Sequence, residues 1–175
     1  MSGKGKGQMN IVLPGLDENA FCRLYDNCRE DLYRYAYYKL GSREEAEDAV
    51  QDCVLEAWRG LSGLRRVEAF RGWIFKILAA SCNRRIRGII KEREKKDAVR
   101  QQEMPVAESA GEKAERNLAL GQALAQLTEE ERDIVLLSAV AGLTSAQIAE
   151  QTGLQPGSVR SKLSRSLARM RKHLT

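Results

Sequence analysis

The chain has 175 residues, of which 43% are hydrophobic and 30% are charged, and its formal net charge is +5. It contains no run of about 18 uncharged apolar residues, and its first residues lack the apolar stretch of a secretory signal. We therefore expect a cytoplasmic protein without membrane insertion, built from one ordinary domain or two small ones. Abundant Leu and Ala, few aromatic residues and only three prolines predict an all-α fold.

The sequence offers no set of metal ligands. No CxxC pair occurs among the four cysteines, and His173 is the only histidine, so zinc-ligand spacings are missing and we expect no cofactor. A nucleophile–base pair and a phosphate-binding loop are also missing, which argues against an enzyme. Free cysteines are frequently buried, so core thiols are favoured over a redox-sensing pair.

Basic and acidic residues alternate in blocks along the chain. Residues 17–58 hold 5 basic and 11 acidic residues, whereas residues 59–96 hold 12 basic and 3 acidic residues. Residues 97–133 hold 4 basic and 9 acidic residues, and residues 134–175 hold 6 basic and 1 acidic residue. Two separate basic segments can each neutralise phosphates, which indicates two contacts with nucleic acid.

The first predicted helices carry clear start and stop signals. Apolar residues recur at spacings of three and four over 21–40, which predicts one amphipathic helix that ends at Gly41. Ser42 followed by Glu45 is the pattern of a capping box, so a second helix begins there and extends to Trp58. We expect Trp58 on the apolar face of this helix, whose opposite face is acidic.

The middle of the chain contains breakers and one long helical pattern. Glycines and two arginines over 60–66 favour a mobile basic loop, and a third helix is predicted over 67–95. Residues 97–116 lose the apolar periodicity and are interpreted as a flexible linker. Their Glu and Ala content leaves open a partly helical connector packed on one domain. The composition of residues 1–16 predicts a disordered N-terminal tail.

The last sixty residues predict three short helices. Thr128 and Glu131 form the pattern of a capping box before an apolar helix, and Thr144 begins a shorter second helix. Gly153 then lies in a tight turn, and Pro156 takes the first position of the last helix. Two helices joined by such a turn are typical of a helix-turn-helix.

The last helix has one apolar and one polar face. The residues expected to be buried are Val159, Leu163, Leu167, Met170 and Leu174. Those on the opposite face are Ser158, Ser161, Lys162, Arg165, Arg169 and Lys172. Serines allow a close approach to DNA, while Arg and Lys reach base edges or phosphates. A solvated basic helix would explain the charge but not the preceding turn, so DNA binding is favoured.

Specific motifs resemble those of a known family. The segments 127–132, 141–143, 147–149 and 157–165 resemble region four of extracytoplasmic-function sigma factors, the group IV members of the bacterial sigma-70 family. Independently, EAEDAVQD over 45–52 and FRGWIFKI over 70–77 resemble region two. The resemblance implies region two over 17–96 and region four over 117–175, joined by the linker 97–116.

The resemblance also implies a function and a set of contact residues. A sigma factor binds core RNA polymerase and directs promoter recognition, DNA melting and transcription initiation, here for a stress or envelope regulon. The residues expected to bind the clamp coiled coil of the polymerase are Asp48, Gln51 and Asp52. Those expected at the minus-ten element are Arg65, Arg66, Lys76, Arg84 and Arg87. Those expected at the minus-thirty-five element are Ser158, Arg160, Ser161, Lys162, Arg165 and Arg169.

Other contacts and departures follow from the same resemblance. The loop 60–66 is favoured for holding a flipped base, whereas Phe70 and Trp73 are favoured as core residues. Many relatives carry Asn in place of Ala80 and Asp near Arg84, so the promoter sequence does not follow from the family. The expected partners are core RNA polymerase, promoter DNA and an anti-sigma factor, with the protein a monomer when free or a heterodimer with its inhibitor.

A second hypothesis is a one-component transcription regulator that binds an operator as a dimer. This hypothesis explains the helix-turn-helix but not the acidic and basic blocks of the first half, and it predicts two half-sites rather than dependence on polymerase.

Overall fold

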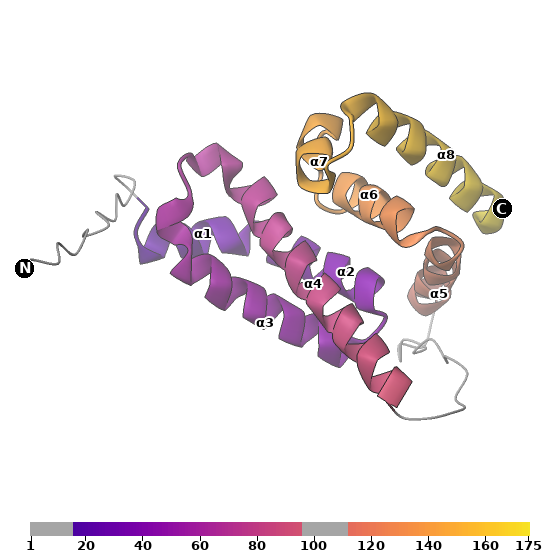
Figure 1. Cartoon of the computed structure of the whole chain (residues 1–175), viewed down its shortest axis with the longest axis horizontal. Helices are drawn as coiled ribbons and strands as arrows, with labels where there is room; N and C mark the ends of the chain where they lie inside the picture. Colours follow the sequence, from indigo (N-terminus) through magenta and orange to yellow (C-terminus); the bar gives the residue numbers. More distant parts are fainter. Residues whose placement is uncertain (1–15, 96–111) are drawn as a thin grey trace, which may run out of the picture.

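The chain folds into two groups of helices (Figure 1). The computed structural model describes residues 16–95 and 112–175, and within these ranges it contains no strand. The first group consists of α1 (Glu18–Asp26), α2 (Arg29–Leu40), α3 (Arg43–Arg59) and α4 (Phe70–Lys95). The second group consists of α5 (Glu112–Ala125), α6 (Glu129–Ala139), α7 (Ser145–Thr152) and α8 (Pro156–Leu174). The predicted all-α fold of two small helical domains is confirmed.

Two predicted segments fall largely outside the described residues. These are the tail 1–16, apart from the buried residue Leu16, and residues 97–111 of the predicted linker. The last five residues of the predicted linker, 112–116, belong to α5.

The single helix predicted over 21–40 is two helices, and this prediction was wrong. The backbone N–H of Cys28 donates to Tyr25 O at 2.9 Å, a bond to the third preceding residue that tightens the chain and ends α1. The thiol of Cys28 also donates to Leu24 O and Tyr25 O, both at 3.4 Å. The apolar spacing continues across this bend, so periodicity alone does not reveal it. Gly41, with φ of 71°, ends α2 as predicted.

The core of the first group lies between α2, α3 and α4. Tyr35 of α2 meets Phe75 of α4 edge to face, with ring centroids 5.9 Å apart, and both side chains are fully buried. Leu32, Ile74 and Leu78 are also fully buried. Each side chain of this size contributes about 1.5–3 kcal/mol through the surface it removes from water.

The segment between α3 and α4 contains two short 3₁₀ helices, η1 (Leu61–Gly63) and η2 (Val67–Ala69). Leu64 between them is buried and attaches the loop to the core. Trp58 is 45% exposed, so its predicted place on the buried face of α3 was wrong. The buried positions of α3 include Ala57 instead, and Trp58 lies one residue around the helix from that stripe.

The helix boundaries of the second group follow the predicted caps. Thr128 and Glu131 form a complete capping box at the start of α6, and Thr144 and Gln147 form another at the start of α7. Gly153 adopts the left-handed conformation, with φ of 76°, in the turn before α8. Pro156 is the first residue of α8. The predicted helix-turn-helix is therefore formed by α7 and α8.

The buried stripe of α8 differs from the predicted one. Val159 and Met170 are buried as predicted, whereas Leu167 is 38% exposed and Leu174 is 49% exposed. Ser166 is fully buried in place of Leu167. The positions of α8 that face the core are spaced four, three and four residues apart along one side of the helix. This spacing places Ser166 against the core and leaves the more hydrophobic Leu167 outside it.

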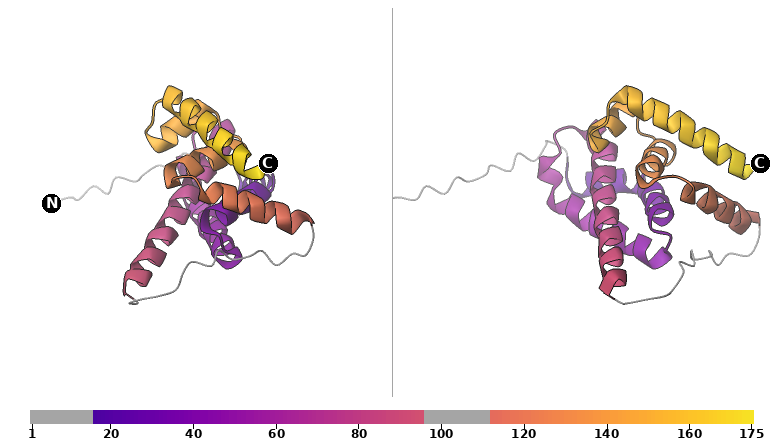
Figure 2. Two further views of the ribbon diagram at one scale, coloured as in Figure 1. Left: turned by 90° about the vertical axis from the view of Figure 1, so that its right-hand side faces the viewer. Right: turned by 45° about the vertical axis from the view of Figure 1, so that its right-hand side comes forward.

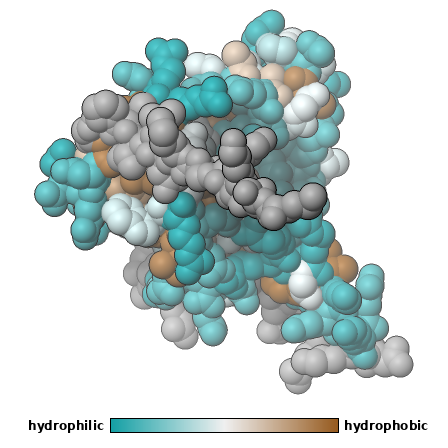
Figure 3. All heavy atoms as spheres, turned by 60° about the vertical axis from the view of Figure 1, so that its left-hand side comes forward, coloured by the Kyte–Doolittle hydropathy of each residue, from teal (hydrophilic) through white to brown (hydrophobic). Residues whose placement is uncertain are grey.

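The two groups pack against each other through α2 and α4 on one side and α6 and α7 on the other. The right-hand view of Figure 2 shows α2 and α4 lying between α3 and the C-terminal helices. The face shown in Figure 3 is mostly hydrophilic, with hydrophobic residues in small separate patches. No helix within the described residues is long and apolar enough to cross a membrane.

The cysteines differ in exposure. Burial raises the pKa of the Cys28 thiol to about 11 and raises those of Cys53 and Cys82 to about 12. Cys22 is exposed. The three buried thiols are thus protonated near neutral pH and shielded from reagents.

We predict that iodoacetamide at pH 8 modifies one thiol in the folded protein, at Cys22, and all four after unfolding in guanidinium, because the thiolate is the reacting form. Intact-mass spectrometry counts the adducts, and the Cys22→Ser variant, which should show none when folded, is the control. Rapid native modification of Cys53 or Cys82 would contradict the burial described above.

Candidate nucleic-acid and polymerase interface

The predicted polymerase-binding residues lie together on α3. Asp48, Gln51 and Asp52 are all exposed, and their spacing of three and four places them on one side of the helix. The side chains of Asp48 and Asp52 are 52% and 54% exposed. The arrangement is an acidic helical face that can meet a basic protein surface.

Arg85 of α4 holds this acidic face and was missed by the sequence analysis. Its guanidinium donates to Glu45 Oε2 at 2.9 Å and to Asp52 Oδ2 at 2.6 Å, and it lies 3.8 Å from Asp48 Oδ2. Burial lowers the pKa of Arg85, but hydrogen bonds to Asp52 and Glu45 raise it more, so the net shift is upward. Arg85 therefore remains charged and restricts the rotamers of the carboxylates.

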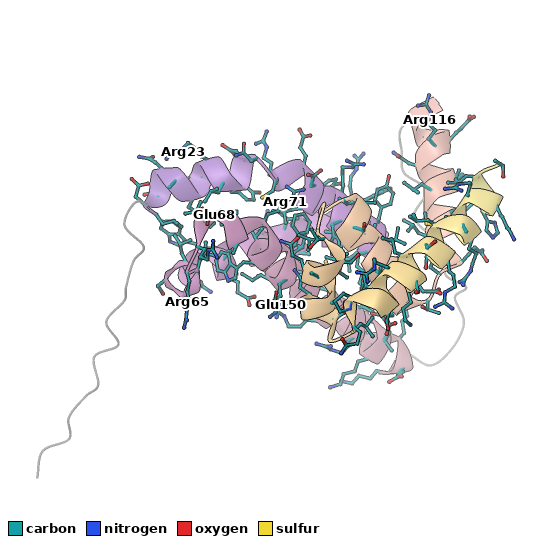
Figure 4. The ribbon with its side chains drawn as sticks, turned by 90° about the horizontal axis from the view of Figure 1, so that it is seen from above. Arg23, Arg65, Glu68, Arg71, Arg116 and Glu150 are labelled. Carbon is teal, nitrogen blue, oxygen red and sulfur yellow. The ribbon has the colours of Figure 1, made fainter. Side chains whose placement is uncertain are left out.

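The predicted minus-ten residues are spread along one end and one side of the first group. Arg65 and Arg66 are exposed in the segment before α4, and Arg65 is visible at the loop end in Figure 4. Lys76 and Arg87 are exposed on α4, about 16 Å apart along the helix axis. Arg84 instead pairs with Glu56 of α3 at 2.9 Å, so part of its charge is neutralised within the domain.

An aromatic cluster supports the loop 60–66. Phe21 meets the rings of Trp58 and Phe70 edge to face, with centroids 5.3 Å and 5.8 Å away, and Trp73 lies 5.8 Å from Phe70. A Cβ atom at Gly60 would lie 3.7 Å from the ring of Trp73, so the loop begins directly against this cluster. Phe70 is buried and Trp73 packs on the core, which agrees with their expected structural role.

The predicted minus-thirty-five residues occupy α8, but in two different situations. Ser158, Arg160, Ser161 and Arg165 are exposed. Arg165 Nε donates to Ser161 O at 3.3 Å, which lays its side chain along the helix. Arg160 and Arg165 form no ion pair within the residues that the structure describes, so their charges remain available to an anionic partner.

Lys162 and Arg169 instead attach α8 to the start of α6. Lys162 Nζ lies 2.5 Å from Glu130 Oε1, and Arg169 donates to both oxygens of Glu131, at 2.9 Å and 3.2 Å. Glu131 also accepts from the backbone N–H of Thr128 at 3.0 Å. This backbone hydrogen bond, together with Arg169, lowers the pKa of Glu131. Both basic residues therefore orient α8 against the start of α6.

Comparison with known proteins agrees with these two helical units. Residues 24–89 match the family model for sigma-70 region 2, and residues 117–170 match that for sigma-70 region 4. The ECF RNA polymerase sigma factor SigM of Mycobacterium tuberculosis is 30% identical over 154 residues, covering 88% of this chain and 76% of that protein. The ECF RNA polymerase sigma factor RpoE of Cereibacter sphaeroides is 28% identical over 171 residues, covering 95% and 93%.

Solved structures show the same fold. The sigma factor RpoE in complex with the anti-sigma factor NepR from Bartonella quintana matches with a TM-score of 0.74 and 22% identity, over 88% of this chain and 96% of that one. CnrH in complex with the cytosolic domain of CnrY matches with a TM-score of 0.65 and 21% identity, over 90% and 89%.

An acidic helix in one unit and a basic helix-turn-helix in the other, on these two matched regions, define a sigma-70-type transcription initiation factor. Within that class, the chain belongs to the ECF RNA polymerase sigma factors. The hypothesis of a one-component regulator is not favoured, because it leaves the region 2 match unexplained.

Proposed function

We propose that this protein, as a group IV sigma factor, binds core RNA polymerase and places it on promoters through two DNA contacts. The observation that carries the proposal is the separation of charge. The acidic face of α3 and the basic residues of α8 lie on the two units that match region 2 and region 4. The protein would act by binding rather than by catalysis, in the cytoplasm where polymerase and DNA are found.

The proposed division of the chain follows the family matches. Residues 17–96 would form region two, 97–116 the linker and 117–175 region four, after an N-terminal tail over 1–16. The matched spans 24–89 and 117–170 support these boundaries.

Region two would provide the polymerase contact and the minus-ten contact. In this proposal Asp48, Gln51 and Asp52 meet basic residues of the polymerase clamp, with Arg85 fixing the carboxylates beforehand, so that less side-chain entropy is lost on binding. Arg65, Arg66, Lys76 and Arg87 would contact phosphates and unpaired bases. Arg84 would contribute less, because its pairing with Glu56 must be broken first.

Region four would read the minus-thirty-five element with α8. The two serines of the exposed face let the helix approach the major groove, and Arg160 and Arg165 would reach base edges or phosphates. Lys162 and Arg169 are proposed at the margin of this contact, since each already neutralises a glutamate of α6.

An anti-sigma factor is the proposed inhibitor. One structurally similar protein is a sigma factor that was solved in complex with an anti-sigma factor, and CnrH was solved in complex with the cytosolic domain of CnrY. We propose that this protein is a monomer when free or a heterodimer with such an inhibitor. Affinity capture from uninduced cells that recovers polymerase subunits but no small partner would contradict this proposal.

The polymerase contact predicts the effect of removing both carboxylates from α3. The variant Asp48→Ala/Asp52→Ala should bind core RNA polymerase about tenfold more weakly, which corresponds to about 1.4 kcal/mol. Surface plasmon resonance at several salt concentrations measures the loss. The control Glu18→Ala/Glu150→Ala removes two exposed acidic residues elsewhere and should bind normally. Equal weakening of both variants would show a nonspecific charge effect and contradict the assignment.

The groove assignment predicts a sequence-dependent effect at Arg165. Arg165→Ala should reduce the use of promoters with a matched upstream element by roughly 1–3 kcal/mol if the side chain contacts a base. Arg171→Ala, at an exposed position in the last turn of the same helix, is the control. Transcription from promoters with matched and scrambled upstream elements provides the comparison. An equal loss on both would indicate a phosphate contact instead.

A further inference from the structure

The C-terminal half of α4 extends beyond the core of the first helical group. The last buried residue of this helix is Cys82, and the residues that follow continue the helix as far as Lys95, over about 20 Å. Ile90 in this extension is 51% exposed although it is apolar. Figure 2 shows the same end of α4 projecting past α2 and α3. The extension is therefore a helical surface that is open to a partner.

Three basic residues form a stripe along this extension. Arg87, Lys91 and Lys95 recur every four residues, which places them on one side of the helix over a length of about 12 Å. All three are exposed, and none forms an ion pair among the described residues. Arg84 lies on the same side one turn earlier, but its charge is paired with Glu56. The unpaired charge of this basic stripe therefore begins at Arg87.

The basic stripe does not stabilise the free helix. Like charges four residues apart repel each other, at a cost of about 0.2–0.5 kcal/mol for each pair. Glu94, three residues after Lys91, is the acidic residue nearest to the stripe, and no ion pair joins the two in the described structure. A partner that carries regularly spaced negative charges would replace the repulsion by attraction. The arrangement thus favours an anionic, repetitive partner.

Duplex DNA has the charge spacing that the basic stripe requires. Phosphates of one strand recur about every 3.4 Å along the axis, so the stripe spans about four base pairs. Lys76, proposed for the minus-ten element, lies earlier on α4, and the loop 60–66 expected to hold a flipped base lies before that helix. The opposite end of α4 is thus the end that faces paired DNA. Lysine is a flexible point charge, which suits phosphates better than base edges.

We propose that Arg87, Lys91 and Lys95 bind phosphates of the duplex directly upstream of the minus-ten element, whatever the sequence of that duplex. This inference rests on the proposed function, because that element is engaged within the polymerase complex. The contact adds affinity without selectivity, since phosphates carry no direct sequence information. It also supplies positive charge where Arg84 supplies little, because Glu56 partly neutralises that residue.

The experiment measures binding of fork-junction DNA to the complex of this protein with core RNA polymerase. The DNA carries the unpaired minus-ten strand of a promoter selected by run-off transcription, and it lacks a minus-thirty-five element. Its upstream duplex is either about two or about eight base pairs long, so that only the longer one spans the stripe. Fluorescence anisotropy at several salt concentrations gives the affinities. The background protein should bind the longer fork more tightly and with a steeper salt dependence.

Removal of two lysines should flatten this salt dependence. On the longer fork, Lys91→Ala/Lys95→Ala should reduce the slope of log affinity against log salt by about two, because each phosphate contact contributes about 0.9. From about 50 mM to about 200 mM salt, the background affinity should therefore fall about tenfold more than that of the variant. On the shorter fork the two proteins should agree. Alanine favours helix, so circular dichroism should show α4 intact.

The matched control is Arg93→Ala. Arg93 is exposed in the same extension but lies about 200° around the helix from Lys91. Lys91→Ala alone should lower the slope by about one, whereas Arg93→Ala, which removes the same charge, should leave it unchanged. Equal effects of these two substitutions would show a general charge effect and contradict the basic stripe. An unchanged slope in the double variant would contradict it as well.

Formation of the polymerase complex separates this inference from the proposed function. A background protein that forms no complex with core RNA polymerase would overturn the proposed function. Binding of the free protein to random-sequence duplex DNA at about 20 mM salt would then decide the stripe, because Lys91→Ala should bind more weakly than Arg93→Ala. A complex that binds both forks with the same affinity in every variant would overturn the stripe and leave the proposed function standing.

Discussion

Charge pairing by the arginines of α4 determines which charged surfaces of this protein remain available to a binding partner. Arg71 donates to Ala141 O just beyond the end of α6, Arg84 neutralises Glu56, and Arg85 spans the carboxylates of α3. Each guanidinium sits between helices that would otherwise place like charges or bare carbonyls close together. One helix thereby orients the acidic face proposed for polymerase, reduces one of the proposed DNA contacts and joins the two domains.

The same division of roles occurs in the second domain. The basic face of α8 is not uniform, because Lys162 and Arg169 attach the helix to Glu130 and Glu131 while Arg160 and Arg165 extend from it without ion-pair partners in the described structure. Glu131 also caps α6, so the cap of α6 and the contact between α6 and α8 depend on the same residue. A basic residue on the helix proposed to bind DNA can therefore act chiefly in positioning that helix.

Local signals made much of the fold predictable. The caps at Thr128 and Thr144 and the left-handed glycines were read from residue types because their chemistry acts over three or four residues. The bend at Cys28 and the burial of Ser166 could not be predicted in this way. A backbone hydrogen bond ends α1 at Cys28 although the apolar spacing continues, and helix packing buries Ser166 although a more hydrophobic residue is next to it. The contacts of Arg71, Arg85 and Lys39 join residues that are 33 to 94 positions apart in the sequence, and no local pattern marks such partners. The grouping of Asp48, Gln51 and Asp52 on one face was predictable from helical spacing, whereas their pairing with Arg85 was not.

Binding to purified core RNA polymerase, followed by run-off transcription over a library of promoter sequences, tests the central claim most directly. The account predicts a stable complex with core and initiation at promoters that share a defined pair of elements. The contradictory result is a protein that ignores core polymerase and binds duplex DNA alone as a dimer. That result would remove the proposed roles of Asp48, Gln51 and Asp52 together.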